Sequence, residues 1–318
     1  MPQTILSWQE IIGFLFFIVA VISPPVLICS RFLAWKLGRA SLPSRLVLTL
    51  WVGFLLLEMA CILEGYYLEP HWIELVTERL PMAKIKAGTT LRLIHLSDTH
   101  FEGRPLDWSR AEVLDMLEQA RPDVICLTGD YLNDRSAGPE FSKFLARLPK
   151  IATTVAIEGN WDYRTPEFLN TFPDLGITLL HNEALSLSIK GQTITFVGTD
   201  LFSAPQLGEF LKGISSDSLV VAMNHLPDFY ESGAALGVDL MLAGHTHGGQ
   251  ICLPWYGALI TLARTGKRFE AGLYKVGNSW AHTSRGLGLE GGLAPRVRFW
   301  GRPEVTILDL ASPERNAR

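Results

Sequence analysis

The stretch LRLIHLSDTH, residues 91–100, contains the pattern that decides the fold. An apolar run, Leu91–Leu96, is followed at once by the polar residues Ser97-Asp98-Thr99-His100. A short apolar run that ends in polar and turn residues predicts a buried strand. The pattern recurs in VICLTGDYLND (124–134), TVAIEGNWD (154–162), LVVAMNH (219–225) and LMLAGHTHGGQ (240–250). Because open α/β folds bind ligands beyond the carboxyl ends of their strands, we expect these polar clusters to meet at one crevice.

The chain from about residue 66 alternates between predicted strands and helices. Helical spacing of apolar residues marks Trp108–Ala120, Phe141–Leu148 and Phe229–Leu236, with Asp107 as the N-cap of the first. Additional strands are predicted at Ile194–Gly198, Val297–Phe299 and Val305–Leu310. This alternation, with hairpins after Ile251, predicts an α/β sandwich of two sheets flanked by helices. We expect one domain over residues 66–311 and a tail at 312–318.

The N-terminal part of the chain is far more apolar than the rest. Hydrophobic residues make up 48% of the whole chain, charged residues make up 19%, and the mean hydropathy is +0.20. This composition is more apolar, and poorer in charged residues, than that of a typical soluble enzyme. Ile11–Cys29 is a run of 19 residues without charge, close to the roughly 20 that span a bilayer. No Lys or Arg precedes it, so the positive region of a signal peptide is missing. We expect residues 1–65 to form a membrane anchor, with helices at about 11–30 and 46–63.

The second apolar stretch, Leu46–Leu63, is interrupted by Glu58 and predicts either a second span or an interfacial or core helix. The loop before it is purely basic, with Arg31, Lys36, Arg39 and Arg45. The positive-inside rule places such a loop in the cytoplasm. If both stretches span, the C-terminal domain lies outside the cytoplasm, and if only the first spans, it lies inside. The sequence therefore predicts a protein of the inner or plasma membrane with one or two transmembrane helices.

The expected crevice is rich in metal-ligating side chains. The clusters supply carboxylate, amide and imidazole groups: Asp98, His100, Asp130, Asn160, His225, His245 and His247. Such N and O donors suit Mn²⁺, Fe or Zn²⁺ better than Ca²⁺ or an iron–sulfur cluster. A carboxylate shared by two metals is how two-metal hydrolases hold the attacking and leaving oxygens of a phosphate. The four cysteines are scattered without CxxC spacing, which excludes a thiolate zinc site.

Taken in chain order, these motifs resemble the calcineurin-like metallophosphoesterase family. They are Asp98-x-His100, Gly129-Asp130-x-x-Asn133, Gly159-Asn160-x-Asp162, His225 and Gly244-His245-x-His247. The resemblance covers about residues 66–310 and implies the family's α/β/β/α sandwich and two divalent metal ions. One metal would be held by Asp98, His100, Asp130 and His247. The second would be held by Asp130, Asn160, His225 and His245, with Asp130 bridging and these four residues counted as catalytic.

The later motifs are similar to those of a membrane-associated branch of the family. They are Gly248-Gly249-Gln250, residues 282–288 and residues 302–304. That branch includes bacterial phosphodiesterases and the UDP-2,3-diacylglucosamine pyrophosphohydrolase of lipid A biosynthesis. The resemblance implies a metal-dependent phosphoric ester or pyrophosphate hydrolase, with a lipid-linked phosphoester as one substrate class. Because no Ser or Cys with an adjacent base lies in the clusters, the expected nucleophile is a metal-bound hydroxide.

Trp161 is the one clear departure from the family pattern. The family has at this position a histidine that contacts the phosphate and protonates the leaving oxygen. An indole offers one N–H donor and no acid–base chemistry. We expect Trp161 and Asn133 to contact substrate. His181 and His282 are the candidates to replace the missing acid, and the alternative for each is a loop or sheet histidine without a catalytic role. His71 and His95 lie in predicted strands and are expected to be structural.

Two other functions compete with a membrane phosphoesterase. A nuclease of the same fold needs a basic groove, which the net charge of −4 and the N-terminal apolar segments disfavour, so no nucleic-acid partner is expected. A catalytically impaired membrane interaction module is the second alternative, supported by Trp161. The apolar runs Leu253–Ile260, Leu201-Phe202 and Phe210-Leu211 predict either an acyl-chain cradle beside the metals, or packed core or an interface with the membrane helices.

Overall fold

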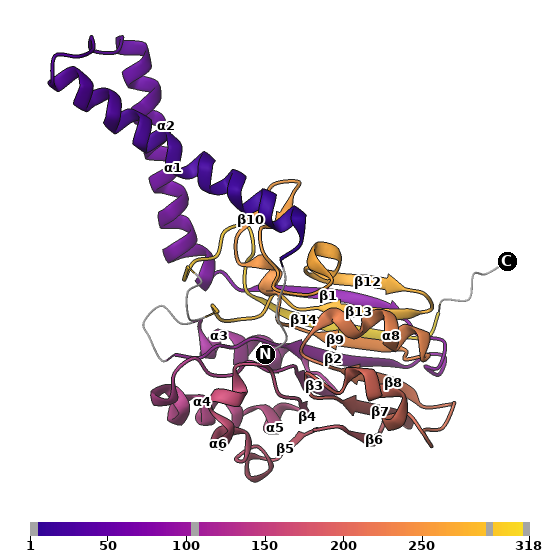
Figure 1. Cartoon of the computed structure of the whole chain (residues 1–318). Coiled ribbons are helices and arrows are strands. Elements are labelled where there is room, and N and C mark those ends of the chain that lie inside the picture. The colour runs from indigo at the N-terminus through magenta and orange to yellow at the C-terminus, as the bar shows by residue number, and fades with distance from the viewer. Residues whose placement is uncertain (1–5, 103–107, 291–294, 314–318) are drawn as a thin grey trace.

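The computed structural model of the chain describes residues 6–102, 108–290 and 295–313. Two six-stranded sheets lie face to face, helices cover their outer faces, and a pair of long helices projects from one end of the sandwich (Figure 1). The expected α/β/β/α architecture is confirmed.

The first sheet carries the N-terminal metal motifs. Its strand order is β1 (Glu74–Pro81), β14 (Glu304–Ala311), β2 (Thr90–Leu96), β3 (Val124–Leu127), β4 (Thr153–Ala156) and β5 (Ile177–Leu179). The strands β2 to β5 are parallel, whereas β14 pairs antiparallel with β2. The loops after β2, β3 and β4 therefore leave the sheet at the same edge.

The second sheet carries the later motifs. Its strand order is β12 (Gly272–Val276), β13 (Ser279–Thr283), β9 (Leu240–Ala243), β8 (Leu219–Met223), β7 (Gln192–Gly198) and β6 (Glu183–Ile189). The strands β7, β8 and β9 are parallel, so their following loops also share one edge. A small hairpin, β10 (Cys252–Leu253) and β11 (Gly257–Ala258), follows the last metal motif.

Alternating side chains of the strands build the layers of the core. On β2, Leu93 packs between the sheets with Val221 of β8, whereas its neighbour Ile94 packs under the helices of the first sheet. Val220 likewise points outward, toward Tyr230 of α8. Because successive residues of a strand face opposite sides, one sheet contributes to two layers at once. This packing on both faces holds the strand ends rigidly.

Six short helices cover the sheets. They are α3 (Arg110–Ala120), α4 (Gly138–Leu145), α5 (Leu148–Ile151), α6 (Pro166–Leu169), α7 (Leu207–Phe210) and α8 (Tyr230–Ala235). The predicted helix at 141–148 is two helices, because Pro149 opens a new one. The helix α3 is capped by Ser109, whose Oγ accepts from Glu112 N at 3.3 Å, and the predicted cap Asp107 lies outside the described residues.

Two strand predictions were wrong. Residues 297–299 form only one isolated bridge, between Phe299 and Ile251, because neighbouring backbone groups bond to separate loops, as when Arg298 N donates to Gly65 O. His71 ends a 3₁₀ turn, Glu69–His71, in which Pro70 has no N–H to donate to a strand. His95 does lie on β2 and is fully buried.

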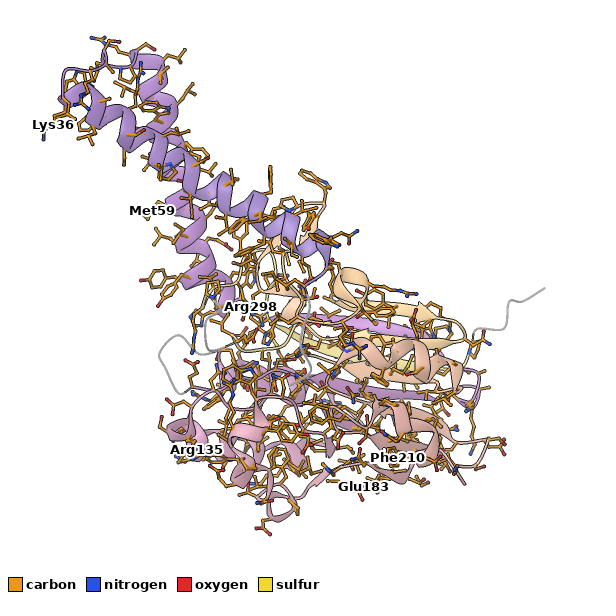
Figure 2. The ribbon with its side chains drawn as sticks, in the orientation of Figure 1. Lys36, Met59, Arg135, Glu183, Phe210 and Arg298 are labelled. Atoms are coloured by element: carbon orange, nitrogen blue, oxygen red, sulfur yellow. The ribbon has the colours of Figure 1, made fainter. Side chains whose placement is uncertain are left out.

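The projecting helices are α1 (Trp8–Lys36) and α2 (Arg45–Leu63), both long and apolar enough to cross a membrane. At about 1.5 Å per residue, α2 is close to the roughly 30 Å of a bilayer core and α1 exceeds it. Their connecting loop lies at the end far from the sandwich, where Figure 2 labels Lys36. The other two ends, the start of α1 and the end of α2, lie next to the domain, and the labelled Arg298 lies in that region.

Candidate metal centre

The seven predicted ligands converge where the two sheets meet. Asp98 and His100 follow β2, Asp130 follows β3, and Asn160 follows β4 of the first sheet. The second sheet adds its own set, which is His225 after β8 and His245 with His247 after β9. Each ligand therefore lies within four residues of a strand end, which limits its movement.

Five ligands have backbone conformations that side-chain-bearing residues rarely adopt. Their φ values are all positive: Asp98 48°, His100 37°, Asp130 56°, His245 70° and His247 52°. Such conformations cost free energy and persist where the surrounding structure imposes them. Gly244 shows how tight the site is, because a Cβ there would overlap Ser97 Oγ and Asp98 Oδ2. The fold holds these donors in place against local strain.

Carboxylate and imidazole groups form two overlapping clusters suited to metal binding, Asp98–His100–His247 and Asp98–Asp130–His225. His247 Nε2 lies 3.3 Å from Asp98 Oδ1. Asp130 Oδ2 lies 3.2 Å from His225 Nε2 and 3.5 Å from His100 Nε2. Asp98 belongs to both clusters, and Asp130, the predicted bridging residue, faces a histidine of each.

Neighbouring groups fix the tautomers of three histidines. His100 Nδ1 donates to Asn133 Oδ1 at 2.7 Å, and His225 Nδ1 donates to Thr128 O at 2.7 Å. His245 Nε2 donates to Leu262 O at 3.1 Å. In each ring the other nitrogen is left with a lone pair, the arrangement that outer hydrogen bonds give to metal-ligating histidines.

The lone pairs face one another in a way that a cation would resolve. His100 Nε2 lies 3.0 Å from His247 Nε2, and His245 Nδ1 lies 2.9 Å from Asn160 Oδ1. His225 Nε2 is buried and has no hydrogen-bond partner. Two lone-pair atoms at these separations repel unless a proton or a metal ion lies between them. The donor set therefore fits two divalent metal ions.

The electrostatics of the cluster favour ionised carboxylates. Burial alone would raise the pKa of Asp98, but the facing imidazoles of His247 and His225 hold it well below its ordinary value. Burial and the nearby His247 lower the pKa of His100 to about 4, so this ring is neutral and able to ligate. Although burial alone would lower it, the carboxylates of Asp130 and Asp98 raise the pKa of His225 to about 10. The site thus offers anionic oxygens together with imidazoles whose charge depends on these neighbours.

Asp162 ties two of the site loops together. Its carboxylate accepts from Asp130 N at 2.9 Å, Tyr131 N at 2.9 Å and Gly159 N at 2.7 Å. Burial and the charge of Asp130 raise its pKa to about 7. This residue is the last member of the Gly159-Asn160-x-Asp162 motif, and its hydrogen bonds explain why a carboxylate is needed there.

Comparison with known proteins agrees with this geometry. The family model described as "Calcineurin-like phosphoesterase" matches residues 91–249, the interval from β2 to the last histidine motif. The chain is 35% identical over 254 residues to phosphodiesterase YaeI of Escherichia coli K12, covering 77% of this chain and 91% of that protein. This chain belongs to the calcineurin-like phosphoesterase family. It is a metal-dependent phosphoester hydrolase.

Two other relatives extend the comparison. The uncharacterized metallophosphoesterase YkuE of Bacillus subtilis is 29% identical over 260 residues, which is 78% of this chain and 90% of that protein. A zebrafish (Danio rerio) "Transmembrane protein with metallophosphoesterase domain" is 28% identical over 262 residues, which is 75% of this chain and 56% of that protein. Together with α1 and α2, this relative indicates that the phosphoesterase is associated with a membrane.

The four side chains predicted to contact substrate or replace the acid lie in different surroundings. Trp161 meets the His100 ring edge-on at 5.4 Å, and its backbone N donates to Asp130 Oδ1 at 2.7 Å. Asn133 has its amide engaged with His100, Glu102 and Leu289 O, so the structure places it behind a ligand.

The histidines proposed as acids stand apart from the ligand clusters. His181 is half exposed, with Nδ1 3.1 Å from Glu158 Oε1. His282 is buried, and its Nδ1 lies 2.8 Å from His95 Nδ1. Among the described residues, neither belongs to the groups that contain Asp98.

Sequence reasoning missed two charged residues around the site. The Arg164 guanidinium lies 3.7 Å from the centroid of the Trp161 ring, a cation–π contact. Glu290 lines a pocket next to His245 and His247, and burial raises its pKa. The Arg164 contact has a local signal, since Arg164 follows Trp161 in one turn, whereas nothing near Glu290 indicates a site.

Proposed function

We propose that this chain is a membrane-anchored, two-metal enzyme that hydrolyses a phosphodiester or pyrophosphate bond. The observation that carries the proposal is the set of lone-pair atoms, partnerless or facing one another, around Asp98 and Asp130. We assign one metal to Asp98, His100, Asp130 and His247. The other is assigned to Asp130, Asn160, His225 and His245.

When bound, two divalent metals would supply Lewis-acid stabilisation of the phosphate and a water of lowered pKa. The chain's contribution is to hold the donors rigidly: Leu262 O and Thr128 O orient His245 and His225, and Asp162 fixes the backbone at Asp130. Trp161 closes one side of His100 with an apolar face. We propose that Trp161 excludes water from this side of His100. Because an indole cannot act as a general acid, Trp161 does not assist protonation of the leaving oxygen.

Metal loading and turnover test this proposal together. Full-length protein purified in detergent, stripped with chelator and reloaded with Mn²⁺, Fe²⁺ or Zn²⁺ is expected to bind two ions per chain. It should cleave bis(4-nitrophenyl) phosphate only when loaded. Full activity in excess chelator would refute the metal mechanism. Metal binding without any hydrolysis would instead support the catalytically impaired interaction module.

We also propose that residues 1–65 anchor the catalytic domain, residues 66–311, outside the cytoplasm. The start of α1 and the end of α2 both lie beside the domain, and the basic loop that connects the helices lies at the opposite end of the pair (Figure 1). Glu58 lies four residues, about 6 Å, from the middle of α2 at Phe54, so a second span carries the cost of a carboxylate inside the bilayer. Protease added to intact cells should cut the catalytic domain, whereas a protected domain would indicate a single span.

We propose a lipid-linked phosphoester as the substrate. An enzyme anchored in the bilayer meets such substrates at their own surface, and YaeI, a relative, is named a phosphodiesterase. UDP-2,3-diacylglucosamine, the substrate suggested by the lipid A branch, is a cytoplasmic precursor. The same protease experiment therefore tests it, because a domain found outside the cytoplasm excludes that compound and leaves other lipid phosphoesters.

A further inference from the structure

The anchor helix and the metal centre share one cavity. A pocket of about 530 Å³ is lined by His245 and His247 and by Phe14, Phe17 and Ile18 of α1. This volume is within the range of roughly 300–1,000 Å³ of small-molecule sites. A helix expected to span the membrane thus forms part of the wall of a cavity that reaches two metal ligands.

Much of the remaining apolar wall comes from the loop after the β10 hairpin, and Ile251 and Pro295 add to it. Leu259, Ile260 and Leu262 line the pocket, and Leu262 also accepts the hydrogen bond from His245. One loop therefore contributes both to the apolar lining and to the orientation of a ligand. The predicted acyl cradle at 253–260 meets this lining only at its last two residues.

Buried hydrogen bonds hold α1 against this loop. The Glu10 carboxylate is fully buried, and its Oε1 accepts from Thr261 N and Thr261 Oγ1, both at 2.8 Å. At the preceding residue of α1, Gln9 O accepts a hydrogen bond from Tyr256 Oη at 2.6 Å. Because a buried carboxylate is stable only when its oxygens are satisfied, these bonds fix α1 in place. The wall formed by α1 is therefore part of the folded site.

The pocket also lies near the domain end of α1. At about 1.5 Å per residue, Phe14 to Ile18 lie roughly 9–15 Å from the domain end of a helix some 43 Å long, about 13 Å longer than a bilayer core. Trp255 lies between β10 and β11 and is fully exposed, and its neighbour Tyr256 is hydrogen-bonded to Gln9 of α1. Exposed tryptophans of this kind are enriched at membrane interfaces.

We propose that this pocket binds the acyl chain of a membrane lipid whose phosphoester reaches the metals, with Phe14, Phe17 and Ile18 as specificity-determining residues. The proposal rests on the phosphoesterase function above and deepens it. The phosphate binds at the end of the pocket formed by His245 and His247, and the acyl chain extends along α1 toward the bilayer. The substrate enters from the bilayer without leaving it.

A chain-length series tests the pocket. Methyl, hexyl, decyl and tetradecyl 4-nitrophenyl phosphates present the same leaving group with increasing apolar length. Each methylene buried is expected to raise kcat/KM by up to about fourfold until the pocket is full. The gain should appear mainly in KM, because the chain is bound equally in ground and transition states. Equal kcat/KM across the series would overturn the proposal while leaving the phosphoesterase intact.

A filled pocket gives the matched variant. Ile18→Trp places an indole in the cavity and should lower the tetradecyl-to-methyl ratio of kcat/KM at least tenfold. Val19→Trp makes a similar change on the next residue, which lies on the exposed side of α1, and should keep the ratio of the native protein. Equal ratios in the two variants would contradict the assignment of this wall.

A binding measurement separates the pocket from catalysis. Metal-free full-length protein in phosphatidylcholine vesicles is photolysed with a tetradecyl phosphate that carries a diazirine at the chain end. We expect label on residues 259–262 that excess tetradecyl phosphate removes. Label confined to outward residues such as Phe16 would overturn the proposal even if the loaded enzyme hydrolyses phosphoesters. Loss of all hydrolysis with pocket labelling intact would instead refute only the proposed reaction.

Discussion

The metal centre and the α1 pocket share His245 and His247 but are built differently. The centre comes from the ends of strands packed on both faces, and five of its seven predicted ligands have left-handed backbone conformations. The pocket comes from a membrane helix and a loop, joined by a few hydrogen bonds such as Glu10 to Thr261. The comparison teaches that the chemistry is fixed by the sheets, whereas the choice of substrate depends on the anchor.

The largest effect is expected at the centre itself. Asp130→Asn removes a charge from the oxygen that faces both His100 and His225, so we expect kcat to fall about 10³-fold or more and one metal to be lost. Short and long phosphoesters should suffer equally, since the pocket is untouched. Metal content and turnover measure this, with Asp115→Asn on the exposed face of α3 as the control. A loss restricted to long substrates would show that the two regions are not separable.

A smaller effect, confined to substrates with poor leaving groups, is expected at Trp161. Acid assistance is worth roughly 10²–10⁴-fold for a poor leaving group, and the indole cannot supply it. Trp161→His should therefore raise turnover of alkyl phosphodiesters by about tenfold or more and change aryl esters little.

Turnover of dimethyl and bis(4-nitrophenyl) phosphates compares the two classes, and Trp161→Phe serves as the control that adds no acid. If the native enzyme already cleaves both classes equally fast, another group supplies the proton and this interpretation of Trp161 is wrong.

The join between anchor and loop gives a moderate effect on stability. Glu10→Ala leaves the buried Thr261 N–H without a partner, which costs about 1–3 kcal/mol. We expect a lower Tm in detergent and faster proteolysis within residues 259–266. The exposed Glu112→Ala on α3 should leave both unchanged. An unaltered Tm in Glu10→Ala would mean that the hydrogen bonds between Glu10 and Thr261 do not stabilise the contact between α1 and the loop.

The smallest effect concerns the strand that follows the anchor. Although burial alone would raise it, the pKa of Glu74 on β1 is lowered by hydrogen bonds to Arg285 and Arg302. The lowered folded pKa means that the ionised form stabilises the fold above its ordinary pKa, and this stability disappears as the pH falls through the folded value.

Because Glu74 is about one-third exposed, Glu74→Gln should cost only about 0.5–1 kcal/mol at neutral pH. Urea unfolding of both proteins should converge in acid. A difference that persists below the folded pKa would assign the effect to packing.

The ligand positions were predictable from sequence because each follows a short apolar strand at once. Asp98 and His247 lie 149 positions apart, yet both motifs can be recognised locally. The strand β1 was missed because its exposed polar residues, Thr77 and Arg79, interrupt the apolar pattern, and its partner β14 lies at the other end of the chain. Short strands such as β5, with three residues, carry too little pattern to detect.

The pocket was only partly predictable. The sequence placed an apolar run after the last metal motif, and Leu259 and Ile260 do line the cavity. The contribution of Phe14 and Ile18 depends on how α1 packs, which is a tertiary contact between residues almost 250 positions apart. The spacing of apolar residues along the sequence does not predict which distant residues pack together. Tautomers and lone-pair directions at the metal centre likewise depend on distant carbonyls such as Leu262 O.

The hydrogen bonds from Glu10 to Thr261 have a practical consequence for anyone who prepares a water-soluble fragment. Deleting residues 1–65 removes one wall of the cavity and leaves the Thr261 N–H exposed to solvent. Such a fragment should retain turnover of small chromogenic esters, because all seven metal-ligand positions remain. Its ranking of substrates would be that of an open groove, so screens for the natural substrate belong on the full-length protein in a bilayer.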